Sequence, residues 1–342
     1  MIAIRAANEA DIPAINRIYN QPGVRRFTLG LPYLSESRYR KSFTENAALR
    51  HVLVACGPDG VVLGTASLAR NGSPRRAHAG SLGVMVAEEA QRRGIGRALF
   101  TALLDLADNW LNLHRLELGV FANNTPAIAL YRSLGFEIEV TERHDAMQDG
   151  ILADCHMMAR LRPGLAVDRS APPPRPATAP RQPFTLRAIE PEDAPALTAM
   201  MNLPGVRHGT LVTPFLTEES RKHLTEPEAG IQTIAAVAQG ELVGVAVLKP
   251  GKGRRLHSAY LSALIVHDEW QGQGIGRALL AAMLDVTDNW LGLSRVSLAA
   301  LADNHHAIRL YEAFGFETEG RMRADVFRNG AYADGVSMAR LR

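Results

Sequence analysis

The chain has 342 residues, of which 46% are hydrophobic and 21% charged, and its formal net charge at pH 7 is +3. This composition is typical of a globular protein with apolar cores, and so small a net charge does not favour nucleic acid as a partner. No apolar run reaches membrane-spanning length, and no apolar leader follows Met1. The only cysteines are Cys56 and Cys155, which we expect to be buried thiols. The sequence therefore predicts a cytoplasmic protein without a disulfide framework, a membrane partner or a metal site.

The second half of the chain repeats the first. The segment 91–99, QRRGIGRAL, returns as QGQGIGRAL at 271–279, and the closing segment 158–162, MARLR, returns at 338–342. Each repeating unit is the size of a domain, whereas the units of a solenoid are short. We therefore predict two tandem domains, 1–162 and 184–342. The proline-rich segment 163–183 cannot build a core and is expected to be an extended linker.

Strands and helices alternate through each half. In the predicted helix 96–110, Leu99, Leu103, Leu106 and Trp110 recur at helical spacing and are expected to share one face. A glycine-rich turn precedes this helix, at the carboxyl end of a strand, where open α/β sheets bind ligands. The other elements predicted in the first half are strands over 2–5, 51–56, 61–68, 78–86 and 115–121, helices from Asn8 or Asp11 to Tyr19, over 35–43 and over 125–134, and two closing strands, with a break at Pro22-Gly23.

The glycine-rich turn has the pattern of a pyrophosphate cradle. Gly94 and Gly96 have no Cβ atom, so backbone N–H groups can approach a diphosphate closely. The helix that begins there adds its positive end, and the nearby arginines suit a polyanionic small molecule. Because the same turn occurs between strand and helix at 271–277, the sequence predicts the same kind of site twice.

A second repeated motif makes the prediction more specific. The pattern Asn124-x-x-Ala-Ile-x-Leu-Tyr131-x-x-x-Gly-Phe follows the turn in the first half, and Asn304 and Tyr311 mark its second copy. Together with Gln-x-x-Gly-x-Gly, this pattern resembles the GNAT superfamily of acyl-CoA-dependent N-acetyltransferases, in particular the bacterial L-amino acid N-acetyltransferases. The resemblance implies an α/β fold with two tandem domains. Each would contain a central mixed, mostly antiparallel sheet flanked by helices.

The resemblance also implies acetyl-CoA as co-substrate and a set of site residues. Asn124 and Asn304 would contact the co-substrate. Tyr131 or Tyr311 would protonate the departing thiolate, which a phenol held by a helix can do; the alternative is a tyrosine that only packs the core. Backbone groups of the preceding strand would contact the pantetheine arm, and amides of the turn would hold the diphosphate. These residues are Val84, Met85, Val86, Arg92, Arg93, Gly94, Ile95, Gly96 and Arg97 in the first half, and Leu264, Ile265, Val266, Gly272, Gln273, Gly274, Ile275, Gly276 and Arg277 in the second.

The general base is harder to identify. His78 and His257 are the recurrent titratable residues upstream of the turns, although either could be structural at a strand start. His78 lies eight positions before Val86, whereas His257 lies nine before Val266, so the two side chains face opposite sides of the sheet unless a bulge absorbs the extra residue. Glu117 has no counterpart in the second half and is interpreted as structural.

The two copies of the site also differ in charge and in their surroundings. Gly272 and Gln273 replace Arg92 and Arg93, which leads to the hypothesis that both halves bind acetyl-CoA and the first binds it more tightly. The acceptor pocket is expected in the regions 25–33 and 207–215, where Tyr33 and Phe215 would place an aromatic ring near the mouth. Loops without ligand contact are the alternative.

The sequence thus predicts an enzyme that transfers an acetyl group to the primary amine of a small molecule, with an amino acid favoured by the resemblance. A polyamine, an amine drug or a protein N-terminus is the alternative acceptor. One half could instead be a non-catalytic acyl-CoA-binding or structural domain. The duplicated chain is expected to be a monomeric pseudo-dimer or to form a homodimer.

Overall fold

The computed structural model describes residues 2–44, 47–168, 182–219, 225 and 230–342. The chain divides into two compact units, Met1–Leu165 and Ala166–Arg342. Most of the predicted linker, residues 169–181, lies outside the described residues. None of the described helices is long and apolar enough to cross a membrane.

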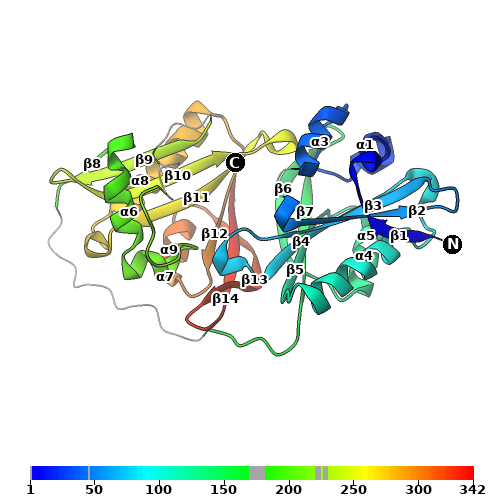
Figure 1. The fold of residues 1–342 in the computed structure, drawn as a ribbon. Coiled ribbons are helices and arrows are strands. Elements are labelled where there is room, and N and C mark those ends of the chain that lie inside the picture. The colour runs from blue at the N-terminus through cyan, green and yellow to red at the C-terminus, as the bar shows by residue number, and fades with distance from the viewer. Residues whose placement is uncertain (1, 45–46, 169–181, 220–224, 226–229) are drawn as a thin grey trace. The chain divides into compact units, whose positions relative to one another are not determined.

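The first half is a mixed sheet flanked by helices (Figure 1). Its strands lie in the order β1-β2-β3-β4-β5-β7-β6, and every neighbouring pair is antiparallel except β4 and β5. The elements are β1 (Ala3–Ala6), α1 (Ile12–Asn20), α2 (Pro22–Arg26), α3 (Glu36–Thr44), β2 (Arg50–Cys56), β3 (Val62–Arg70), β4 (Ala79–Val86), α4 (Ile95–Asp105), β5 (Arg115–Phe121), α5 (Thr125–Ser133), β6 (Glu137–Gln148) and β7 (Ile151–Leu161).

The second half has the same architecture, with strands in the order β8-β9-β10-β11-β12-β14-β13 and one parallel pair, β11 with β12. The predicted fold, two mixed and mostly antiparallel sheets flanked by helices, is therefore confirmed. The elements are β8 (Thr185–Ala188), α6 (Ala194–Met201), α7 (Pro204–Gly209), β9 (Gln232–Ala238), β10 (Glu241–Pro250), β11 (Ser258–Val266), α8 (Ile275–Asp285), β12 (Arg295–Leu301), α9 (His305–Glu312), β13 (Glu317–Arg328) and β14 (Ala331–Leu341).

The parallel pair in each half is short. Strand β4 pairs with β5 only from Ala79 to Ser81, whereas its pairing with β3 continues to Val86. In the second half, β11 pairs with β12 only up to Tyr260. Beyond these points the carboxyl ends of β4 and β11 have one backbone edge without a recorded strand partner among the described residues. Their N–H and C=O groups on that edge can therefore hydrogen-bond a ligand.

A β-bulge absorbs the extra residue of the second half. Opposite β10, Val247 pairs with Ala263 and Leu248 with Leu261, so Ser262 is the additional residue. Strand β4 pairs with β3 without such a shift. Because the bulge restores the alternation of side chains, His257 occupies the position of His78, and the two histidines are equivalent.

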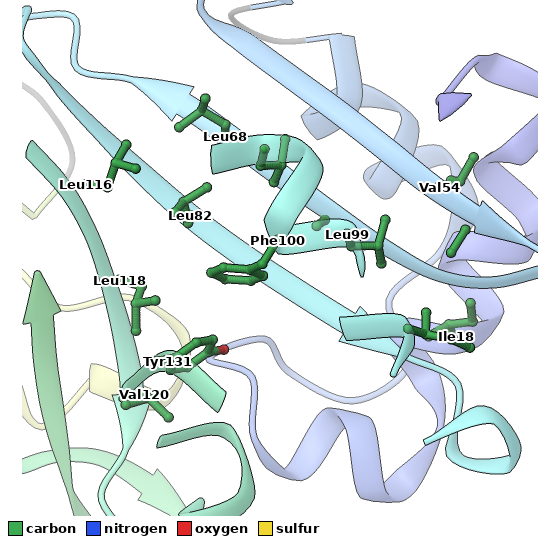
Figure 2. Close-up of a cluster of buried hydrophobic side chains, with 14 of the residues drawn as sticks. Ile18, Val54, Leu68, Leu82, Leu99, Phe100, Leu116, Leu118, Val120 and Tyr131 are labelled. Atoms are coloured by element: carbon green, nitrogen blue, oxygen red, sulfur yellow. The ribbon is translucent and has the colours of Figure 1, made fainter. Parts of the chain in front are cut away.

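Helix α4 packs its apolar face on the sheet, as predicted. Leu99 and Leu103 are fully buried, and Figure 2 shows Phe100 lying beside Leu82 of β4. The prediction that Trp110 shares this face is wrong, because its side chain is 76% exposed. The chain changes to a π-helical turn over Leu106–Trp110, and the wider turn breaks the 3.6-residue period.

The predictions for Pro22 and for the two cysteines can also be compared with the structure. Pro22 begins the short helix α2 instead of only breaking the chain, because proline is well suited to the first turn of a helix. Cys56 and Cys155 are both buried and not in a disulfide, as predicted.

Candidate active site

A pocket of about 640 Å³ lies at the carboxyl end of β11 in the second half. Leu264 and Val266 of β11 form part of its wall, together with the turn that includes Gly272 and the first residues of α8. Asn304 and Tyr311 also line it. The fold thus places the strand end, the glycine-rich turn, the asparagine and the tyrosine around one cavity.

Some predicted residues do not line this pocket. Ile265 is buried in the core on the other face of the sheet, as the two-residue period of a strand requires. The side chain of Gln273 is turned away, and its Oε1 accepts a hydrogen bond of 3.1 Å from the backbone N–H of Gln182. His257 is not among the lining residues. In the first half, His78 lies eight positions before Val86, a separation of about 26 Å along an extended strand.

The turn itself has a special backbone conformation in both halves. Gly94 and Gly274 precede the helices with φ angles of 79° and 93°, in the left-handed region that favours glycine. Position 92 is also left-handed, since Arg92 has a φ of 61° and its counterpart Gly272 a φ of 80°. The second half therefore has the unstrained residue at this position, whereas the first half keeps an arginine there at a cost in backbone strain.

Two further features prepare the turn for an anion. Neither α4 nor α8 has a side-chain cap at its N-terminus, so the first N–H groups of each helix are available. The side chain of the repeated glutamine hydrogen-bonds the last residue of the preceding strand. Gln91 Nε2 donates to Val86 O at 3.3 Å, and Gln271 Nε2 donates to Val266 O at 3.4 Å. The glutamine of the Gln-x-x-Gly-x-Gly motif thus stabilises the turn, and the glycines leave its backbone accessible to an anion.

The charges around the second pocket do not come only from the turn. Three basic residues of α9 also line it: His305, His306 and Arg309. Their counterparts in the first half are the uncharged residues Thr125, Pro126 and Ala129. We did not predict the three basic residues, although their basic character was visible next to Asn304. The guanidinium of Arg309 offsets part of the loss of the two turn arginines, so the two sites differ in charge by less than their turns alone suggest.

Both tyrosines are 7% exposed, and burial raises the pKa of Tyr131 and of Tyr311 to about 12. The ring of Tyr131 packs against Phe100 with centroids 5.2 Å apart. Figure 2 shows its hydroxyl pointing away from Leu118 and Val120 of β5. A tyrosine that packs in the core can also reach a bound ligand, because Tyr311 belongs to the core and lines the pocket. The role in packing and the proposed role as proton donor are therefore compatible.

The predicted acceptor region of the second half reaches the pocket through α7. His208 and Gly209 line the second pocket, and the N–H of Gly205 donates to Asp268 Oδ2 at 2.8 Å, which ties α7 to the segment after β11. Phe215, in contrast, does not line the pocket and is 93% exposed. Its counterpart Tyr33 is 90% exposed, so neither ring is buried against a described part of the chain.

Glu117 has the structural role that we expected. It accepts hydrogen bonds from Arg76 at 2.9 Å and from Arg115 at 3.1 Å, inside the sheet. Among the described parts of the chain, no group of three or more His, Cys, Asp or Glu side chains is placed to hold a metal ion.

Comparisons with known proteins agree with this geometry. The acetyltransferase (GNAT) family matches the chain twice, over residues 14–136 and 200–316. The L-amino acid N-acetyltransferase AaaT of Escherichia coli is 37% identical over 161 residues, which are 47% of this chain and 98% of that protein. A spermidine N(1)-acetyltransferase of Vibrio cholerae is 29% identical over 44% of this chain and 88% of its own length.

Among solved structures, a GNAT superfamily phosphinothricin acetyltransferase from Sinorhizobium meliloti in complex with acetyl-CoA is similar to one half. It is 24% identical, with a TM-score of 0.44, over 47% of this chain and 88% of that chain. The two family matches together cover more than half of the sequence. The chain therefore belongs to the acetyltransferase (GNAT) family, with the family's domain present twice, and is an acyltransferase.

Proposed function

We propose that each half binds acetyl-CoA and transfers its acetyl group to the primary amine of a small molecule. The observation that carries this proposal is the pocket of the second half, which is lined by the glycine-rich turn, the end of β11, Asn304 and Tyr311. The first half has the same elements in the same order. Asn124 lies at the start of α5, and Tyr131 lies within that helix.

The co-substrate would lie across the carboxyl end of the sheet. Its diphosphate would be held by the uncapped N-termini of α4 and α8, with the exposed turn arginines of the first half or Arg309 of the second as counter-ions. Its pantetheine arm would lie along the edges of β4 and β11 that have no recorded strand partner. Asn124 and Asn304 cap the following helices, with side-chain oxygens 3.4 and 3.2 Å from the N–H of Ala127 and Ala307.

In the reaction, the amine nitrogen attacks the thioester carbonyl, an N–C bond forms, and the C–S bond breaks. Backbone N–H groups of the strand edge stabilise the oxyanion. The amine loses a proton to solvent, and the thiolate takes a proton from Tyr131 or Tyr311. A pKa of about 12 keeps each phenol protonated at neutral pH. After it has donated its proton, the phenolate takes up another from solvent, which its high pKa favours at neutral pH.

For the acceptor, a free amino acid is our first proposal, supported by the similarity to AaaT. In the first half, Arg25 would meet its carboxylate: it lies on α2 over the exposed ring of Tyr33, 5.9 Å from the ring centroid. A polyamine is the second candidate, supported for the second half by the carboxylate of Asp303 on the pocket wall and by the spermidine acetyltransferase relative.

The test is a thiol-release assay with acetyl-CoA against a panel of amino acids, polyamines, aminoglycosides and peptides. We expect release of free CoA with amino acids or with polyamines, and acetylated amine as the second product by mass spectrometry. Binding of acetyl-CoA without thiol release for any amine would instead identify an acyl-CoA-binding protein and would contradict the proposed reaction.

A further inference from the structure

A buried arginine lies behind the pocket of the second half. The guanidinium of Arg328, at the end of β13, is only 5% exposed. Its Nε donates to Asp168 Oδ2 at 2.6 Å, and its Nη2 donates to Asp303 Oδ2 at 2.6 Å. Its Nη1 lies 2.9 Å from His208 Nε2. We call these four residues the Arg328 cluster; two of them, His208 and Asp303, line the pocket.

Asp168 reaches this cluster from the segment between the two repeats. Its backbone N–H donates to Tyr332 O at 2.7 Å, and the N–H of Tyr332 donates to Ala166 O at 2.8 Å, so the segment pairs with the start of β14. The side chain of Asp168 is 3% exposed. Residues 166–168, which composition places in a linker, therefore belong to the second compact unit.

In the first half, two neutral side chains occupy the positions of Arg328 and Asp303. Gln148 stands at the position of Arg328, and Asn123 at that of Asp303. Asn123 Nδ2 donates to Gln148 Oε1 at 2.5 Å, and Gln148 Nε2 donates to the backbone oxygen of Arg26 at 3.0 Å. A neutral amide pair needs no counter-ion. A buried guanidinium does, because an uncompensated charge is costly to bury.

The contacts of Arg328 show how Asp168 can influence the pocket without touching it. Burial lowers the pKa of Arg328, but the hydrogen bonds to Asp303 and Asp168 outweigh burial and raise it. If Asp168 is neutralised, Asp303 remains as the only carboxylate among the described residues that is bonded to the guanidinium. The arginine then gains by moving toward Asp303 and solvent, and the hydrogen bond between Arg328 and His208 is lost. Both changes occur in the pocket wall.

We propose that Asp168 is a positioning residue of the second active site, which holds Arg328 in place and thereby fixes Asp303 and His208 on the acceptor side of the pocket. This inference rests on the proposed function only in assigning that side to the amine. It also predicts that the second domain needs residues 166–168, which a boundary at 184 would remove.

The test uses the full chain and hydrogen–deuterium exchange of the backbone amides of residues 205–210, which cover α7 after Pro204 and include His208. We expect Asp168→Asn to raise their exchange rate about tenfold, since α7 loses its contact with a fixed Arg328. Asp193→Asn is the matched control, because it removes an aspartate–arginine pair of 2.7 Å in the same half away from the pocket. It should leave exchange at 205–210 unchanged.

A second variant pair separates positioning from a general loss of stability. Asp303→Asn with Arg328→Gln reproduces the neutral pair of the first half, so adding Asp168→Asn to that background should raise exchange no further, since the guanidinium that Asp168 holds is no longer there. Equal exchange in the parent and in Asp168→Asn, or an undiminished effect of Asp168→Asn in the neutral background, would overturn the proposal. The double substitution also keeps the test decisive if Asp168→Asn alone unfolds the second half.

Kinetics then connect the cluster to the acceptor. With Tyr131→Phe to suppress the first half, Asp168→Asn should raise the KM for spermidine or for an amino acid about tenfold, and the KM for acetyl-CoA less than twofold. An equal rise in both KM values would contradict an acceptor-side role. Absence of thiol release in every variant, including the parent, would refute the proposed function, whereas the exchange result would still decide the role of Asp168.

Discussion

The guanidinium of Arg160 donates two parallel hydrogen bonds, 2.9 and 2.8 Å long, to the carboxylate of Asp108. Arg340 repeats this arrangement on Asp288, with both bonds at 2.8 Å. Each pair joins the π-helical turn to the last strand of its half. The repeated Asp-Asn-Trp-Leu and Met-Ala-Arg segments therefore have a shared structural cause, because each supplies one partner of a bidentate ion pair.

Replacing Asp108 by Asn should destabilise the first half by about 1–3 kcal/mol, since the arginine keeps its partial burial but loses a charged partner. We expect a fall of several degrees in the melting temperature of one thermal transition, measured by calorimetry. Asp105→Asn is the control, because Asp105 accepts only from the exposed Asn109. Equal stability of the Asp108 variant and the parent would show that the pair contributes nothing.

The corresponding pair in the second half predicts a dependence on acid. Hydrogen bonding from Arg340 holds the pKa of Asp288 below its ordinary value, despite the opposing effect of burial. A carboxylate with a lowered folded-state pKa contributes its full stability above its unfolded pKa and loses it as pH falls through the folded value. Urea unfolding of the parent should therefore show a loss of stability between about pH 5 and pH 2 that is smaller in Asp288→Asn.

The left-handed backbone at position 92 predicts opposite effects on stability and on binding. Arg92→Gly should stabilise the first half by about 1 kcal/mol, because glycine adopts a φ of 61° without strain. The same change removes a cation from the turn and should weaken acetyl-CoA binding severalfold. Gly272→Arg should do the reverse in the second half. Calorimetric titration and urea unfolding of both variants check the two effects separately.

The position of Arg309 on the pocket wall predicts that the second half binds acetyl-CoA. Arg309→Ala should lower its affinity for acetyl-CoA about tenfold, as expected for the loss of one charge-assisted contact to a phosphate. Ala129, the counterpart in the first half, offers the matched experiment, since Ala129→Arg should strengthen binding there. Calorimetry that finds acetyl-CoA bound by the first half alone would contradict the proposal for the second.

Local signals in the sequence were enough to predict the strands, the helices and the glycine-rich turn, whereas the type of sheet and the residues around the turn were predicted from the resemblance to the GNAT superfamily. Apolar periodicity and a glycine between strand and helix act over a few residues, and the repeat presents them twice. The histidine register remained open because a bulge at Ser262 depends on the neighbouring strand. Trp110 was misplaced because the helix changes to a π-helical turn, and the ion pair of Asp108 in that turn is made with a distant strand. The cluster around Arg328 joins segments up to 160 positions apart and has no local signature.

The most direct test of the account measures acetyl-CoA-dependent thiol release by the parent, by Tyr131→Phe, by Tyr311→Phe and by the double variant, with the best amine of the panel. We predict that each single variant keeps the activity of the other half and that the double variant loses about 100-fold in kcat. Because burial sets the pKa of both phenols to about 12, parental activity should show no loss from tyrosine ionisation below about pH 11. Full activity of the double variant would contradict the role of these tyrosines in both halves.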